Sequence, residues 1–242
     1  MNLVTTESSA FDTSIRGTPE CYWAALEPPA WSPPEGPLIV VAPHPDDETL
    51  GAGGLIHTWA EGLRLPVVIV SVTDGEAACP EIPGLAAIRR SELEAAWRDL
   101  APGGGIDLVR LQLPDGRVSQ YEGELATALG TAIPHGVPAT LVAPFEQDGH
   151  PDHDAASAVA REVARSRGAT LAQYPIWAWH QATPAIFAAR KIGRFTLSPG
   201  AQRAKQTAIQ RFQSQLRDRP GGAIVPRHVL EYFARPYEMF VL

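Results

Sequence analysis

An apolar run that stops at a group of acidic residues is the feature that most restricts how this chain can fold. Residues 38–54 read L-I-V-V-A-P-H-P-D-D-E-T-L-G-A-G-G. The first residues are aliphatic, as in a buried strand, and the glycine-rich end starts a helical pattern. The polar residues from His44 to Glu48 therefore lie where a strand gives way to a helix, which is where open α/β sheets bind ligands. A capped helix start is the alternative explanation, because acidic side chains stabilise the positive end of a helix dipole.

A second stretch of the chain repeats this arrangement. Residues 139–154 read A-T-L-V-A-P-F-E-Q-D-G-H-P-D-H-D, so an apolar run again ends in V-A-P and is followed by H-P-D. With equal usage of all residues, a given triplet is expected in a chain of this length only about 3% of the time, so chance is a poor explanation for two copies. Imidazole and carboxylate groups suit zinc and other divalent transition metals. We therefore predict that the two loops face one metal ion, with His44, Asp47 and His153 as ligands that leave one coordination position open.

Alternating strand and helix patterns predict the fold class. Further strand-like runs occupy residues 66–75, 107–113 and 170–177, and helical stretches separate them. This order predicts an α/β fold with a Rossmann-like, doubly wound, mostly parallel sheet flanked by helices. The glycines after the first motif also suggest a dinucleotide-binding enzyme, but Asp46 and Asp47 would repel a pyrophosphate at that position. Tight binding of NAD would favour that alternative.

The 242 residues are expected to form a single domain after an N-terminal arm. Residues 1–37 are rich in proline, which disfavours regular structure, and residues 38–242 form the predicted domain. Trp23 and Trp31 are expected to hold the arm against the domain, and a contact with a second copy of the chain is the alternative. A helical stripe is expected across residues 199–216.

The composition argues against several classes of partner. A net charge of −7 and a pI near 5.5 disfavour nucleic acid binding, which requires a basic surface. The sequence shows neither a signal-peptide pattern nor an apolar stretch of the roughly 20 residues that a membrane-spanning helix needs. The two cysteines, Cys21 and Cys79, indicate no disulfide framework. A cytoplasmic protein without nucleic acid or membrane partners is therefore expected.

Four short motifs resemble those of the PIG-L / LmbE-like deacetylases, which are zinc-dependent enzymes that remove N-acetyl groups from amino sugars and related glycosides. A-P-H-P-D-D-E at 42–48 and H-P-D-H at 150–153 carry the resemblance most specifically. T-D-G-E at 73–76 and R-R-S-E at 89–92 are also similar. The resemblance weakens toward the C-terminal end and does not extend to the N-terminal arm. One departure is Pro43, where the family often has alanine or serine.

The resemblance implies a role for the polar residues of the two loops. The same three residues would bind zinc: His44, Asp47 and His153. Asp46 would act as the general base that takes a proton from the attacking water and returns it to the leaving amine. Protonated His150 would donate a hydrogen bond to the developing oxyanion, and Asp152 would hold the His150 ring in orientation. Arg89 would contact the substrate or acetate.

The predicted function is the hydrolysis of an N-acetyl or other N-acyl group from an amino sugar or glycoconjugate by zinc-activated water. The partner is accordingly a small N-acetylated molecule, and one zinc ion per chain is expected, with another divalent transition metal as an alternative. Trp177 and His180 lie in the aromatic stretch Y-P-I-W-A-W-H and are candidates for stacking on a sugar ring, although such clusters more often belong to a core. A non-catalytic glycan-binding module and a metal amidase acting on a non-sugar amide are the alternatives. Assembly into a homo-oligomer is left open.

Overall fold

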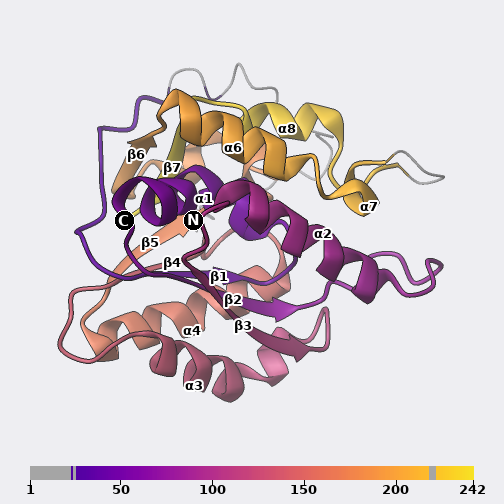
Figure 1. Ribbon diagram of the computed structural model, residues 1–242, viewed down its shortest axis with the longest axis horizontal. Helices are drawn as coiled ribbons and strands as arrows, with labels where there is room; N and C mark the ends of the chain where they lie inside the picture. Colours follow the sequence, from indigo (N-terminus) through magenta and orange to yellow (C-terminus); the bar gives the residue numbers. More distant parts are fainter. Residues whose placement is uncertain (1–22, 24–25, 218–221) are drawn as a thin grey trace, which may run out of the picture.

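One seven-stranded sheet forms the centre of the computed structural model, which describes residues 23, 26–217 and 222–242 (Figure 1). Its strands are β1 (Leu38–Ala42), β2 (Val67–Thr73), β3 (Ile106–Leu113), β4 (Thr140–Pro144), β5 (Thr170–Tyr174), β6 (Ile192–Thr196) and β7 (Tyr237–Val241). In space their order is β3-β2-β1-β4-β5-β7-β6. The strands from β1 to β5 run parallel, whereas β7 pairs antiparallel with both β5 and β6. The predicted mostly parallel sheet is confirmed.

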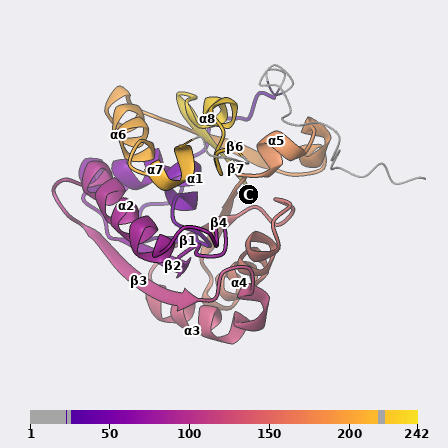
Figure 2. The same cartoon turned by 90° about the vertical axis from the view of Figure 1, so that its right-hand side faces the viewer.

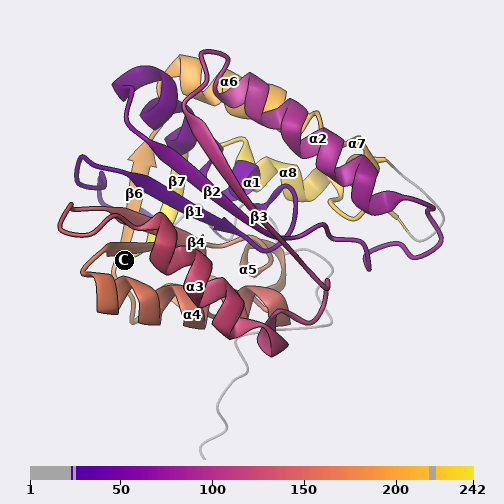
Figure 3. The same ribbon diagram turned by 60° about the horizontal axis from the view of Figure 1, so that its bottom comes forward.

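Helices cover both faces of this sheet. The main ones are α1 (Asp47–His57), α2 (Leu85–Leu100), α3 (Glu122–Ala132), α4 (Pro151–Arg167), α6 (Pro199–Ile209) and α8 (Arg227–Phe233). Shorter helical turns are η2 (Thr58–Leu63), η3 (Val118–Gln120), α5 (Ala178–Gln181), η4 (Pro184–Phe187) and α7 (Gln213–Leu216). The helices α1, α2 and α6 lie over one face (Figure 1), and α3 and α4 lie over the other (Figure 2, Figure 3). The predicted doubly wound arrangement is therefore present.

The two hydrophobic cores explain why β1 is a continuous apolar run. Successive side chains of a strand point to opposite faces of the sheet. Leu38 and Val40 pack in the core beneath α1 and α2, whereas Ile39 and Val41 pack in the core formed with α3 and α4. A Cβ atom at Gly51 would overlap with the ring of Tyr174, so this glycine lets α1 lie directly against the sheet, as expected from the sequence.

The strand order places the two H-P-D loops at one crevice. Strand β1 is flanked by β2 on one side and by β4 on the other. The chain adds β2 and β3 on one side of β1 and then crosses over to add β4 and β5 on the other side. Ligands of open α/β sheets bind at such a switch point, beyond the carboxyl ends of the strands. The first motif leaves the end of β1 and the second leaves the end of β4. The fold therefore brings together two loops that lie about a hundred residues apart in the sequence.

The C-terminal third differs most from the sequence-based expectation. The strand expected at 170–177 ends at Tyr174, because the backbone amides of the next residues donate to the buried carboxylate of Asp148. The helix expected at 199–216 is divided into α6 and α7. Strand β6 was not anticipated, since I-G-R-F-T is short and contains a glycine and an arginine.

The described part of the N-terminal arm contacts the domain as predicted. The Nε1 atom of Trp23 donates to the carbonyl of Trp179 at 2.9 Å, and Trp31 packs against Phe240 with ring centroids 5.3 Å apart. The rest of the arm, residues 1–22 and 24–25, lies outside the described residues. Among the described residues, the helices are too short or too polar to cross a bilayer.

Candidate metal centre

The loop after β1 has an unusual backbone at Asp46. Its φ angle is 129°, a conformation that residues with a Cβ atom rarely adopt. The loop is held in this shape from within, because the Glu48 carboxylate accepts from the Asp46 amide at 3.3 Å and from the Thr49 hydroxyl at 2.6 Å. Backbone strain of this kind concentrates at functional sites. Glu48, whose side chain is fully buried, thus stabilises the loop that presents the acidic residues.

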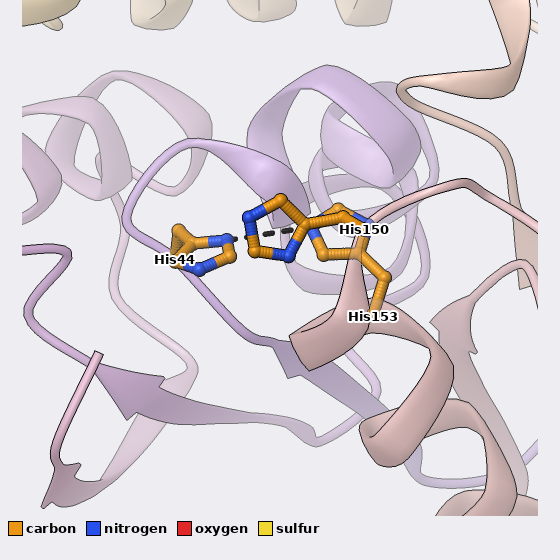
Figure 4. A group of neighbouring side chains, drawn as sticks. All are labelled: His44, His150 and His153. Carbon is orange, nitrogen blue, oxygen red and sulfur yellow. Dashed lines mark hydrogen bonds between the residues drawn. The ribbon is translucent and has the colours of Figure 1, made fainter. Parts of the chain in front are cut away.

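Three side-chain atoms from the two loops form a nearly equilateral triangle. Oδ2 of Asp47 lies 3.3 Å from Nδ1 of His44 and 3.2 Å from Nε2 of His153. The two nitrogen atoms are 3.3 Å apart, a contact that the dashed line in Figure 4 marks. Ligands bound at about 2.0–2.1 Å in a tetrahedron are separated by about 3.3 Å, so one ion fits these three atoms and keeps a fourth position open. The sequence-predicted ligands His44, Asp47 and His153 are therefore brought together.

The other nitrogen of His44 faces two further carboxylates. Its Nε2 lies 3.2 Å from Oδ1 of Asp115 and 3.4 Å from Oδ2 of Asp152. A metal-binding imidazole commonly donates its second N–H to a carboxylate, which fixes the orientation of the ring. These three side chains are also close enough to converge on an ion of their own. Two acceptors within reach of one N–H explain the contacts without a second ion.

Asp115 is a site residue that the sequence analysis missed. It lies in the P-D-G turn after β3, which predicts only a turn. In the structure its Oδ2 accepts from the amide of Ala77 at 2.8 Å, while Asp152 accepts from the amides of Gly116 and Val118 at 2.7 and 3.0 Å. The turn is thereby tied to the start of α4. The available signal in the sequence was its position directly after an expected strand.

His153 is supported by Asp148, the second residue that was missed. The Nδ1 atom of His153 lies 2.7 Å from Oδ2 of Asp148, whose side chain is fully buried. The same carboxylate accepts from three backbone amides, at residues 176, 177 and 178. Burial lowers the pKa of His153, but the attraction of Asp47 and Asp148 outweighs it and raises that pKa to about 9 in the absence of an ion. The sequence signal for Asp148 was its position in the same loop as the predicted ligand His153.

Asp46 lies beside the triangle and does not take part in it. Its carboxylate is nearly buried, and Oδ1 is 3.9 Å from Nη2 of Arg89. Burial raises the pKa of Asp46 well above its ordinary value, and the charge of Asp47 raises it further, while Arg89 opposes the shift. A carboxylate of raised proton affinity beside the three predicted metal ligands suits proton transfer.

Arg89 is held by the protein itself. Its Nη1 donates to the carbonyl of Gly75 at 2.7 Å, and its Nη2 donates to the carbonyl of Pro45 at 3.2 Å and to Oε1 of Gln215 at 2.8 Å. A Cβ atom at Gly75 would overlap with the guanidinium group, so a glycine is required there. Its Nε is buried and has no hydrogen-bond partner among the described residues. Arg89 therefore fixes the loop that carries Asp46 and keeps a single donor unused.

His150 differs from its predicted environment. Its Nδ1 accepts from the backbone amide of Asp152 at 3.2 Å, whereas the Asp152 carboxylate, expected to hold the His150 ring, lies against His44. Burial and the nearby rings of His44 and His153 lower the pKa of His150 to about 4. The ring is therefore neutral near pH 7, where a protonated ring was expected. Since Nδ1 is an acceptor, the N–H of the neutral ring lies at Nε2.

A cavity of about 250 Å³ opens beside these residues. Six of the sequence-predicted site residues line it: His44, Asp46, Asp47, Arg89, His150 and Trp177. The Trp177 ring stacks on the His150 ring at a centroid distance of 5.9 Å. His180 contacts Trp177 at 5.1 Å and is outside the set of residues that line the cavity. The predicted pair of stacking residues is therefore divided, with Trp177 in the cavity wall and His180 beside it.

Several known proteins are similar to this chain in sequence and in fold. A deacetylase of 1D-myo-inositol 2-acetamido-2-deoxy-alpha-D-glucopyranoside from Nakamurella multipartita is 32% identical over 146 residues, which are 57% of this chain and 46% of that protein. The chain thus matches about half the length of this relative. A conserved protein from Thermus thermophilus has 29% identity and a TM-score of 0.59, and the match covers 85% of this chain and 93% of that one.

The N,N'-diacetylchitobiose deacetylase from Pyrococcus horikoshii shares the fold, with a TM-score of 0.58 at 21% identity over 81% of this chain and 73% of that one. The family model described as PIG-L, GlcNAc-PI de-N-acetylase, matches residues 39–164, which are just over half of the chain and include both H-P-D loops. Because the match covers more than half of the chain, the chain belongs to the PIG-L family.

Proposed function

We propose that this protein is a zinc-dependent N-deacetylase that acts on an N-acetylated amino sugar or its conjugate. The observation that carries the proposal is the triangle of ligand atoms from His44, Asp47 and His153, with sides of 3.2–3.3 Å. Two nitrogen ligands and one oxygen ligand suit zinc, and another divalent transition metal is the alternative. Membership of the PIG-L family and the substrates in the names of the relatives support the sugar.

The chain's own residues divide the work of amide hydrolysis between them. When bound, a divalent ion lowers the pKa of a water molecule to about 7 and polarises the substrate carbonyl. Asp46 takes the proton of the attacking water and passes it to the leaving amine, a role that its raised pKa favours. His150 donates its Nε2 hydrogen to the carbonyl oxygen as negative charge develops there, and the neutral ring suffices for this.

Three carboxylates act as positioning groups for the ligand rings. Asp148 holds Nδ1 of His153, and Asp115 and Asp152 hold Nε2 of His44. Each ring is thereby turned so that its remaining nitrogen faces Asp47. Such outer contacts fix both the tautomer and the orientation of a metal ligand. Asp152 thus supports His44, in place of the support for His150 that the resemblance implied.

The predicted substrate contacts differ in their position relative to the cavity. Trp177 is favoured, because its ring lines the cavity and lies next to His150. Arg89 is favoured as a residue that positions Asp46, because both terminal nitrogens already pair with the protein. His180 contacts Trp177 and does not line the cavity, so it is proposed to support the Trp177 ring.

Acetate release from N-acetylglucosamine glycosides tests the proposal. The zinc-loaded protein is expected to release acetate, and the chelated protein and the Asp46→Asn variant are expected to lose at least 100-fold in rate. Asp107→Asn, at an exposed position on β3, is the matched control and should retain the rate. Full activity after removal of all metal would contradict the proposal.

The same assay separates the remaining alternatives. A metal amidase of another kind would release acetate from N-acetylated amines that lack a sugar and would leave the glycosides intact. A glycan-binding module would bind the glycosides with equal affinity before and after the Asp46→Asn substitution and would release no acetate. The cytoplasmic location suggested by the cysteine content stays a prediction, as does any self-association.

A further inference from the structure

The polar groups of the cavity are largely engaged by the protein. Both terminal nitrogens of Arg89 and both ends of the Gln215 side chain are paired, with one another and with the carbonyls of Gly75 and Pro45. Asp115 accepts from a backbone amide and faces His44. The terminal N–H donors of Arg89 and Gln215 are thus used within the protein, and a substrate hydroxyl would find few donors here.

Two polar groups of the cavity wall match a single amide. They are the Asp46 carboxylate, 3.9 Å from Nη2 of Arg89, and Nε2 of His150, whose Nδ1 already accepts from the Asp152 amide. Both belong to the end of the cavity that carries the predicted metal ligands. One acceptor and one donor suffice for an N-acetyl group, and they leave little for the several hydroxyls of a sugar ring.

The remaining wall is apolar and comes from three distant segments. Leu50 of α1 and Ile176 after β5 are buried, whereas Trp177, Ile224 and Val225 are half-buried. The wall is fixed to the reaction centre at two points. The Trp177 ring stacks on His150, and the Val225 amide donates at 3.0 Å to the carbonyl of Gln215, whose side chain contacts Arg89.

We propose that this cavity selects N-acetylated substrates whose amine part carries an apolar group close to the amide, such as an aryl or alkyl aglycone. This inference rests on the proposed deacetylase activity and names its substrate class. An acetyl group offers only one methyl, for which a cavity of about 250 Å³ is far too large. The amine part must therefore occupy the half-buried apolar wall, and the sugar hydroxyls then face water across the opening.

A matched pair of glycosides tests this inference. The zinc-loaded protein is assayed for acetate release from the phenyl and the methyl β-glycoside of N-acetylglucosamine, which differ only in the aglycone. We expect kcat/KM for the phenyl glycoside to be about tenfold or more above that for the methyl glycoside, because an added apolar group in an apolar pocket is worth this much. Equal values would overturn the inference and leave the proposed activity in place.

A substitution in the apolar wall tests whether this wall causes the preference for the phenyl glycoside. Val225→Asn should reduce the ratio of the two kcat/KM values to within about threefold of unity, because it places an amide on the apolar surface. Val137→Asn, at an exposed valine outside the cavity, is the matched control and should keep the wild-type ratio. An unchanged ratio in Val225→Asn would contradict the assignment of the wall.

Two further arms remove the remaining ambiguity. If the methyl glycoside with an N-hexanoyl group reacts faster than its N-acetyl counterpart while the phenyl group has no effect, the wall holds the acyl chain and the inference is wrong. If neither glycoside releases acetate, the proposed function fails. The ratio of the two binding constants, measured by calorimetry, then decides on its own whether the wall prefers the phenyl group.

Discussion

The two loops that carry H-P-D are alike in sequence and differ in how their histidines are held. His153 is supported from its own loop, by Asp148 five positions earlier. His44 is supported from outside its loop, by Asp115 from the turn after β3 and by Asp152 from the start of α4. Asp148 is close to His153 as soon as their loop forms, whereas Asp115 and Asp152 reach His44 only when the sheet is assembled. Equal motifs therefore do not imply equal dependence on the rest of the fold.

Removal of the local support is expected to have the largest effect. Asp148→Asn replaces a fully buried carboxylate that serves His153 and three backbone amides, and an asparagine offers one acceptor oxygen in place of two. We expect the free energy of unfolding to fall by about 3 kcal/mol and the zinc affinity to fall 10–100-fold. Urea titration and chelator competition measure the two quantities. A wild-type free energy of unfolding would show that Asp148 is not the anchor of its loop.

Removal of the remote support is expected to affect the metal more than the fold. Asp115→Asn leaves Asp152 within reach of Nε2 of His44, so we expect zinc affinity to fall about tenfold. The free energy of unfolding should change by less than about 1 kcal/mol, because Asp115 lies at the cavity wall in a turn. A larger loss of stability than in Asp148→Asn would reverse the comparison between the loops.

The backbone of the first loop gives the smallest expected effect. Asp46 has a φ of 129° and its side chain makes no capping hydrogen bond to α1. Asp46→Gly should therefore be more stable than Asp46→Ala by about 1 kcal/mol, because only glycine adopts such a φ without strain. Thermal unfolding of the two variants measures the difference. Equal melting temperatures would mean that the first loop is not strained.

Sequence patterns predicted those features that depend on the residue types within one short segment. The alternation of strand and helix patterns was sufficient to predict the parallel sheet. The paired H-P-D loops were sufficient to predict three candidate ligand atoms, which lie within 3.3 Å of one another. Position along the chain and residue type fix such features, because a buried strand and a metal ligand each need particular side chains.

The contributions of distant segments could not be predicted in the same way. Asp115 appears in the sequence as an ordinary turn residue, and only the pairing of β3 with β2 brings it to His44. Gln215 and Val225 reach the cavity from the C-terminal part, where helical and strand patterns are weak. The neutral state of His150 depends on burial beside two other imidazoles, which no local pattern encodes.

Anomalous diffraction at the zinc absorption edge, from crystals of the zinc-loaded protein, tests the central claim most directly. The account predicts one strong peak at about 2.0–2.1 Å from Nδ1 of His44 and Nε2 of His153, with an oxygen of Asp47 as the third protein ligand. A peak on the opposite side of the His44 ring, between Nε2 and the carboxylates of Asp115 and Asp152, would contradict it.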